Sequence, residues 1–250
     1  MTEAKYTIIL VRHGQSQWNR LDRFCGWEDV HLSTEGARQA EYSGRLIRES
    51  GIIPTVLHTS RLTRSCQTGN IILEQLNRQY IDIYRSWRLN ERHYGALQGR
   101  FKSDVLKEVG KEKYMEWRRA YEGCPPLLEE ADHDDRYRNV DRSELPRGES
   151  LKMVLERFLP YVNDVLVPLL EKDPSEIPLL SVHGSIVRAL IKYWYSISDE
   201  DISGINIPNA IPLVITLDKD FKPVGAYKYL DPQSAYVEAN KVAHQGFGQT

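Results

Sequence analysis

The sequence predicts an α/β fold with three layers, in which helices flank a mostly parallel central sheet and a helical insertion is added. Apolar, strand-like runs alternate with helical patterns along the chain, which is typical of such folds. Two of these runs, residues 8–11 and 179–182, lead into His13-Gly14 and His183-Gly184 and then into helix-like stretches. If both strands are parallel, both histidines lie at the sheet edge where open α/β sheets bind ligands.

Composition limits the classes of protein that are possible. The chain has 250 residues and a formal net charge of −2, which fits one large domain over residues 1–250 and gives no general affinity for nucleic acid or anionic membranes. We find no secretory signal and no apolar run of membrane-spanning length. Three widely spaced cysteines give no disulfide framework or zinc motif. We therefore expect a cytoplasmic protein without nucleic-acid or membrane partners.

Local signals define the elements of the first third. After the strand at 8–11, Ser33 can cap a helix that Gly51 ends. A short strand follows at 56–59, Ser60 can cap the next helix, and residues 81–84 are β-prone.

The middle of the chain differs from its surroundings. Residues from about 100 to 148 combine short helical pieces with Pro125-Pro126 and an acidic run, so we expect an insertion or lid. A regular apolar period over 151–169 then predicts an amphipathic helix that Pro160 kinks.

The last part of the chain contains the second His-Gly unit and two closing strands. Ser185 opens a helix directly after Gly184, and residues 213–217 and 226–230 read as strands. Residues from about 240 to 250 show no packing pattern and predict a mobile tail.

Paired imidazoles beside arginines indicate phosphate chemistry. Phosphoryl transfer needs a nucleophile, fixed positive charge and a proton donor or acceptor. Either His13 or His183 can be the nucleophile while the other stabilises charge, and Arg12 and Arg64 offer forked guanidinium groups that match phosphate. Glu91 is the best carboxylate for proton transfer.

Two neutral hydrogen-bond donors lie close to the first histidine in the sequence. Ser16 and Asn19 follow the first His-Gly turn, where a helix N-terminus also favours an anion.

Each of these residues also has a purely structural explanation when it is taken singly: a histidine after a strand, Arg64 on a helix and Glu91 among arginines. The pair of equivalent His-Gly turns favours function.

Several motifs resemble the cofactor-dependent phosphoglycerate mutases, a branch of the histidine phosphatase superfamily. The Arg-His-Gly triplet is shared by many phosphatases, but the Arg-Leu-Asn-Glu-Arg-His-Tyr-Gly segment and the Trp-Arg-Arg triplet are specific to the mutase branch. The likeness covers nearly the whole chain, through residues 10–19, 26–30, 59–64, 87–95, 117–119, 149–151, 183–184, 197–202 and 206–208.

The resemblance implies a role for each matching residue. His13 would be the phosphorylated nucleophile, Glu91 the acid and base, and three others the rest of the phosphate pocket: Arg12, Arg64 and His183. Substrate would contact the two neutral donors beside the first turn together with residues from the rest of the chain: Ser16, Asn19, Cys25, Gly26, Tyr94, Lys102, Arg118, Arg119, Gly184 and Ser185.

The implied activity is the glycolytic and gluconeogenic interconversion of 3-phosphoglycerate and 2-phosphoglycerate. In this family 2,3-bisphosphoglycerate primes the histidine and no metal is used; a homo-oligomer, dimer or tetramer, is expected. Cys25 stands where Thr is usual, and Ser185-Ile186 where Asn-Ser is usual. The alternatives are a bisphosphoglycerate mutase or a histidine phosphatase on the same site, and a non-catalytic scaffold.

Overall fold

A six-stranded sheet in the order β3-β2-β4-β1-β5-β6 forms the centre of the computed structural model, which describes residues 3–131 and 134–247. Neighbours among β3, β2, β4 and β1 pair in parallel, while β5 pairs antiparallel with both β1 and β6. The predicted mostly parallel sheet is confirmed, with β5 as its antiparallel member. The strands are β1 (Tyr6–Arg12), β2 (Val56–Thr59), β3 (Ile83–Arg85), β4 (Pro178–Val182), β5 (Leu213–Leu217) and β6 (Lys228–Tyr229).

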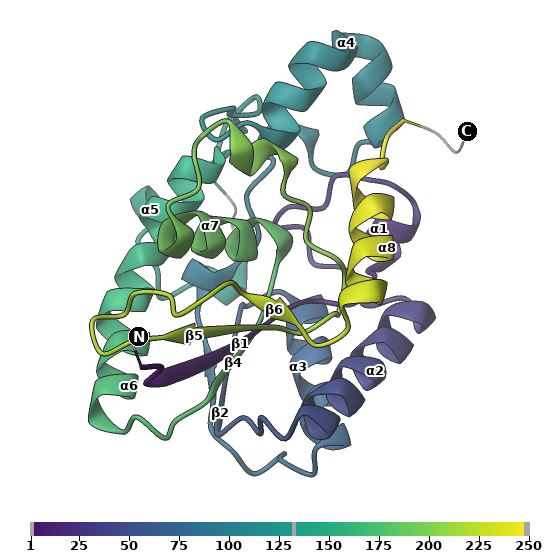
Figure 1. Cartoon of the computed structure of the whole chain (residues 1–250). Helices are drawn as coiled ribbons and strands as arrows, with labels where there is room; N and C mark the ends of the chain where they lie inside the picture. The colour runs from purple at the N-terminus through teal and green to yellow at the C-terminus, as the bar shows by residue number, and fades with distance from the viewer. Residues whose placement is uncertain (1–2, 132–133, 248–250) are drawn as a thin grey trace.

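Helices cover both faces of the sheet, as Figure 1 shows, so the predicted layered α/β fold is confirmed. Two helices, α2 and α3, pack on one face, and α5, α6 and α7 pack on the other. The helices are α1 (Gln17–Arg20), α2 (Thr34–Ser50), α3 (Thr63–Gln75), α4 (Lys102–Arg119), α5 (Leu151–Tyr161), α6 (Val167–Lys172), α7 (Gly184–Tyr195) and α8 (Pro232–Ala243). Single turns of 3-10 helix span Trp87–Leu89, Gly95–Leu97, Asp135–Tyr137, Arg142–Glu144 and Asp201–Gly204.

Strand β1 is apolar on both faces because it lies inside the sheet. Successive side chains of a strand point to opposite faces. Ile8 and Leu10 accordingly join the core under α5 and α7, while Ile9 and Val11 join the core under α2 and α3. This continuous apolar run fixes the strand in register and therefore fixes where its carboxyl end, Arg12, emerges.

Capping residues explain the helix boundaries, with one correction. Ser33 caps α2 by accepting the Gly36 N–H, and Gly51 ends it in the left-handed conformation, as predicted. The prediction that Ser60 caps the next helix is wrong, because α3 begins later and its N-cap is Leu62, which has no side-chain cap. The Ser60 hydroxyl is instead used in the functional site.

The expected kink at Pro160 takes another form. Pro160 lies inside α5, and the chain then continues as a π-helical turn, Val162–Leu166, into α6. The N–H of Val167 bonds to the carbonyl of Val162, five residues back. Prolines lack the N–H that an α-helix requires, and Pro160 and Pro168 flank this turn on both sides, so the strict α pattern is lost between them.

The segment expected to be an insertion lies beyond the sheet edge that carries the site. Helix α4 forms its main part and is broken at Gly110, whose φ of 77° is in the left-handed region. In Figure 1, α4 stands apart from the sheet, next to the C-terminal helix α8. Whether this segment moves as a lid stays a prediction.

The first residues of the segment expected to be a mobile tail, 240–250, belong to helix α8. Helix α8 continues to Ala243, and the following residues pack against α4, where the Tyr114 hydroxyl donates to the carbonyl of Gln245 at 3.0 Å. Residues 248–250 lie outside the described part of the chain. Mobility of the segment stays a prediction.

A close backbone approach holds the first His-Gly turn against α2. A Cβ atom on Gly14 would meet the carbonyl oxygen of Gly36, and one on Gly36 would meet the carbonyl oxygen of Gln15. Neither glycine has a positive φ, so space alone demands glycine at both positions.

Replacement of Gly36 by alanine is expected to lower the free energy of unfolding by about 1–3 kcal/mol, the usual cost of overpacking. The backbone, unlike a flexible side chain, cannot move aside without displacing α2. Urea unfolding measures the effect. Gly204→Ala is the matched control, since no atom lies within 4 Å of its added Cβ, and it should change stability by less than about 0.5 kcal/mol. Equal effects of the two substitutions would contradict the argument.

His58 links the sheet to α5 and titrates with folding. It lies in β2, fully buried, with Nδ1 2.7 Å from the hydroxyl of Tyr161, and burial lowers its pKa to about 4. Between the unfolded pKa of about 6.5 and this value, the unfolded chain binds more protons than the folded one. His58 therefore contributes stability that is complete above pH 6.5 and is lost as the pH falls towards 4.

Urea unfolding over this pH range should reveal that contribution. In the His58→Gln variant, we expect the pH slope of the unfolding free energy to be smaller by about 1.4 kcal/mol per pH unit. His31 is exposed and makes its ring contact with the Gln67 amide, so His31→Gln should retain the wild-type slope. An unchanged slope in His58→Gln would exclude this titration.

Candidate functional site

Parallel pairing of β1 and β4 brings the two His-Gly turns together. Arg12 is in register with Val182, and the N–H of His13 donates to the Val182 carbonyl at 2.9 Å. The His13 and His183 rings are consequently neighbours, with centroids 5.0 Å apart and planes inclined by 62°. The predicted pairing of the histidines at one sheet edge is confirmed.

Hydrogen bonds define the protonation of His13. A carbonyl can only accept, so Nδ1, 2.7 Å from the Gly14 carbonyl, carries the proton. Arg64 Nε donates to Nε2 at 3.2 Å, which leaves the lone pair on that atom. Burial, then Arg64 and Arg12, hold the pKa of His13 well below its ordinary value. His13 is thus a neutral imidazole with Nε2 available as a nucleophile.

Backbone carbonyls hold the two neighbouring guanidinium groups in fixed positions. Arg64 is fully buried and donates to the carbonyls of Gly26 at 2.7 Å and Glu28 at 2.9 Å. Arg12 donates to the Ile207 carbonyl at 2.7 Å, while its buried Nε has no partner among the described residues. Preorganised cations with free donor capacity suit an incoming phosphoryl group.

His183 lies next to His13 and is fully buried. Its Nε2 is 2.8 Å from the Ser60 hydroxyl, and within residues 3–131 and 134–247 its Nδ1 has no hydrogen-bond partner. Burial, followed by Arg64 and His13, lowers its pKa well below the ordinary value, so the free protein holds it neutral.

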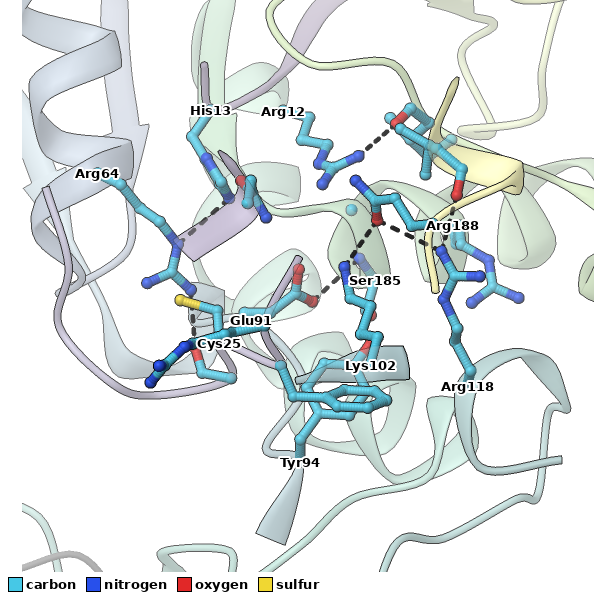
Figure 2. Close-up of a pocket in the computed structure, with 18 of the residues that line it drawn as sticks. Arg12, His13, Cys25, Arg64, Glu91, Tyr94, Lys102, Arg118, Ser185 and Arg188 are labelled. Carbon is cyan, nitrogen blue, oxygen red and sulfur yellow. Dashed lines mark hydrogen bonds between the residues drawn. The ribbon is translucent and has the colours of Figure 1, made fainter. Parts of the chain in front are cut away.

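Hydrogen bonds from two backbone N–H groups hold the Glu91 carboxylate in position. Its Oε1 accepts from Arg92 N at 2.8 Å and from Ser185 N, in the first turn of α7, at 3.1 Å. Figure 2 shows this carboxylate facing into the pocket that His13 and Arg64 also line. Because Ser185 contributes its backbone here, a residue other than the usual Asn can occupy this position.

Cations also line the side of the pocket away from His13. Lys102 Nζ donates to Asp22 and to Gln245 Oε1, each at 2.9 Å, and burial followed by Arg118 lowers its pKa to about 8. Burial alone would raise the pKa of the Tyr94 phenol, but the cationic side chains of Arg92 and Arg118 lower it overall.

Charge in the pocket is strongly positive although the whole chain is slightly acidic. The lining contains one carboxylate, that of Glu91, against seven cationic side chains: Arg12, Arg23, Arg64, Lys102, Arg118, Arg119 and Arg188. Such an excess favours a small ligand that carries several negative charges.

Most of the predicted site residues meet in this pocket, with two exceptions. Ser16 and His183 are not among the residues that line it. The Ser16 hydroxyl accepts from Asn19 N at 3.0 Å as the cap of α1, and the His183 ring lies next to that of His13. Cys25 lines the pocket as a buried thiol whose pKa burial raises, so it is not an activated nucleophile. The predicted residues that line the pocket are Arg12, His13, Asn19, Cys25, Gly26, Arg64, Glu91, Tyr94, Lys102, Arg118, Arg119, Gly184 and Ser185.

Sequence reasoning missed other residues of the lining, among them Arg23, Arg188 and Gln245. Arg188 donates from Nη2 to the carbonyls of Arg119 at 2.9 Å and Ile202 at 2.8 Å. A charged residue inside the apolar run of α7 was a usable signal. Gln245 gave none, since it enters the pocket from the end of the chain.

Residues 3–131 and 134–247 contain neither a cluster of metal-ligating side chains nor a membrane-spanning helix. No group of three or more His, Cys, Asp or Glu side chains there could hold a metal ion. Among the helices of the same ranges, none combines the length and apolar character that crossing a membrane requires.

Comparisons with known proteins agree on one relationship. The family model of the histidine phosphatase superfamily, branch 1, matches residues 8–133. Phosphoglycerate mutase of Candida albicans is 46% identical over 244 residues, covering 96% of this chain and 98% of that protein. The 2,3-bisphosphoglycerate-dependent phosphoglycerate mutase of Streptomyces avermitilis is 44% identical over 252 residues, covering 98% and 99%.

Solved structures share the fold. A mycobacterial glucosyl-3-phosphoglycerate phosphatase aligns with a TM-score of 0.69 at 21% identity, covering 90% of this chain and 97% of that one. Phosphoglycerate mutase from Bacillus anthracis aligns with a TM-score of 0.65 at 18% identity, covering 95% and 96%. At these identities the likeness concerns the fold alone.

Proposed function

Because the chain belongs to the 2,3-bisphosphoglycerate-dependent phosphoglycerate mutases, in branch 1 of the histidine phosphatase superfamily, we propose that it interconverts 3-phosphoglycerate and 2-phosphoglycerate through a phosphohistidine at His13. The observation that carries the mechanism is the neutral His13 imidazole, with its Nε2 lone pair beside Arg64 in a cation-lined pocket. This combination suits a nucleophile that receives a phosphoryl group.

The pocket also fits the bisphosphate that the relatives' names state. Its excess of cations and the unpartnered Nε of Arg12 suit a ligand with more than one anionic group. When bound, 2,3-bisphosphoglycerate supplies the phosphoryl group that primes His13. Arg12 and Arg64 would neutralise the equatorial oxygens of the group as it moves.

Glu91 serves as both base and acid. As the phosphoryl group leaves Nε2 of His13 for the substrate oxygen, the N–P bond breaks, a P–O bond forms, and Glu91 takes the hydroxyl proton. In the second half, Nε2 takes the other phosphoryl group and Glu91 returns the proton to the oxygen released. One carboxylate therefore balances both transfers.

The remaining cations hold the part of the substrate that does not react. Lys102, Arg118 and Arg119 would bind its carboxylate and distant phosphate while the molecule reorients. All three belong to α4, in the segment of about 100–148, so the proposed lid would itself contribute to retention. A single domain over residues 1–250 accommodates this arrangement.

One assay tests the proposal. Purified protein receives 3-phosphoglycerate with and without 2,3-bisphosphoglycerate, and the formation of 2-phosphoglycerate, the bisphosphate level and phosphate release are followed. Rapid isomerisation that the bisphosphate stimulates is expected. Free phosphate as main product would indicate a phosphatase, accumulated bisphosphate a bisphosphoglycerate mutase, and no turnover a scaffold. Light scattering would test the expected dimer or tetramer, and cell fractionation the expected cytoplasmic location.

A further inference from the structure

A cluster of buried hydroxyl groups lies behind His183. Thr59, Ser60 and Ser65 are fully buried, as is His183 itself. Ser60 Oγ is 2.8 Å from His183 Nε2 and 2.5 Å from Ser65 Oγ, which is in turn 3.0 Å from Thr59 Oγ1. The cluster also includes the backbone of Leu62, whose N–H donates to Ser60 Oγ at 3.0 Å. None of these hydroxyl groups lines the substrate pocket.

Each hydroxyl has one proton to donate, which fixes the direction of these bonds. The carbonyl of Leu62 can only accept, and Ser65 donates to it at 3.1 Å. Ser65 must then accept from both Thr59 and Ser60. Since the Ser60 proton is used on Ser65, the two lone pairs of Ser60 receive the Leu62 N–H and a proton from His183. In the reverse direction Ser60 would donate to His183, and Ser65 would donate to Ser60 and lose its bond to the Leu62 carbonyl, which would keep the backbone N–H groups of Ser65 and Cys66. The direction with the larger number of hydrogen bonds therefore has the proton on His183 Nε2.

From this count we infer that Ser60 is a positioning residue, which holds His183 with its proton on Nε2 and reserves Nδ1 for a proton donated to the transferring phosphoryl group. The inference rests on the proposed function of the site. It agrees with the absence of any protein partner for the buried Nδ1. Fixing a histidine tautomer through its second nitrogen is a common way to orient a catalytic imidazole.

The charged groups around His183 explain why the imidazole takes up a second proton only when an anionic ligand binds. Arg64 from α3, Arg12 and His13 at the end of β1, and Arg157 from α5 all disfavour a charged imidazole in the free protein. A dianion bound between Arg12 and Arg64 would reverse that balance. Because Nε2 already holds a proton, the added one, taken from solvent, must bind at Nδ1.

Nitrogen-15 NMR of the histidine rings tests the inference directly. Sulfate is the probe, because it is a dianion that carries no proton of its own near neutral pH. We expect His183 of the free protein to be protonated at Nε2 only, and sulfate to add a proton at Nδ1. In Ser65→Ala, the Ser60 hydroxyl is free to donate to Nε2, so the free protein should hold the His183 proton on Nδ1. In Ser60→Ala, neither ring nitrogen keeps a partner among the described residues, so the free protein should show a mixture of the two tautomers.

Thr59→Val is the matched control, since it changes the same buried cluster without altering the direction of the Ser60 hydroxyl. It should keep the wild-type tautomer and turnover, whereas Ser60→Ala should lower kcat by about tenfold or more with KM little changed. Thermal unfolding confirms that each variant is folded. A wild-type proton on Nδ1 without ligand, or a His183 proton that stays on Nε2 in Ser65→Ala, would overturn the inference. If the protein shows the expected tautomers but has no mutase activity, the inference about Ser60 stands and the proposed function is wrong.

Discussion

Replacement of His13 by alanine is expected to lower mutase turnover by about 10⁴-fold or more, the scale on which loss of a covalent nucleophile acts. The other groups of the pocket bind and polarise the phosphoryl group, but none offers an unprotonated ring nitrogen in the same position. His183 does not substitute, because its Nε2 is 2.8 Å from the Ser60 hydroxyl and is not at the position of His13 Nε2. Substrate binding should be reduced much less than turnover.

The covalent step can be followed separately from turnover. Wild-type protein incubated with 2,3-bisphosphoglycerate labelled in its phosphoryl groups should retain an acid-labile label, and His13→Ala should retain none. His31→Ala provides the matched control, because His31 is exposed and its ring bonds to the Gln67 amide outside the pocket. A folded His13→Ala protein that takes up the label as wild type does would refute the assignment of His13.

The parts of the fold that the sequence predicted are those that local patterns determine. Alternating strands and helices, the capping Ser33 and the terminating Gly51 depend on neighbours within a few residues. The site followed from topology, because two strands that both end in His-Gly must bring their histidines to one edge when they run in parallel. Arg12 needed no further information, since it precedes His13 directly.

Hydrogen bonds between residues that are far apart in the sequence could not be predicted in this way. Ser60 has the side chain of a helix cap, yet its hydroxyl bonds across 123 positions of sequence to His183. Ser16 shows the opposite case, a predicted ligand group that caps α1. A hydroxyl can satisfy either role equally well locally, so tertiary packing decides between them. Gln245 likewise joins Lys102 only because α8 returns the chain to α4.

Replacement of Glu91 by glutamine should lower kcat by about 10²–10⁴-fold, the range that general acid–base catalysis contributes. Glutamine keeps a carbonyl oxygen that can accept the N–H groups of Arg92 and Ser185, so the side chain should stay in position. What it loses is the ability to take and return a proton. KM should therefore change far less than kcat, and the pocket should still bind sulfate.

Partial reactions separate proton transfer from a general loss of structure. Rapid-quench measurement should show that Glu91→Gln transfers its phosphoryl group from His13 to substrate slowly, because the substrate hydroxyl keeps its proton until another base accepts it. Glu144→Gln is the control, since Glu144 is a half-exposed carboxylate that pairs with Arg88 outside the pocket and should leave the rate unchanged. A Glu91→Gln protein with wild-type transfer in both directions would exclude Glu91 as the proton carrier, and the base would then have to be sought among the other lining groups, with Tyr94 first because its phenol has a lowered pKa.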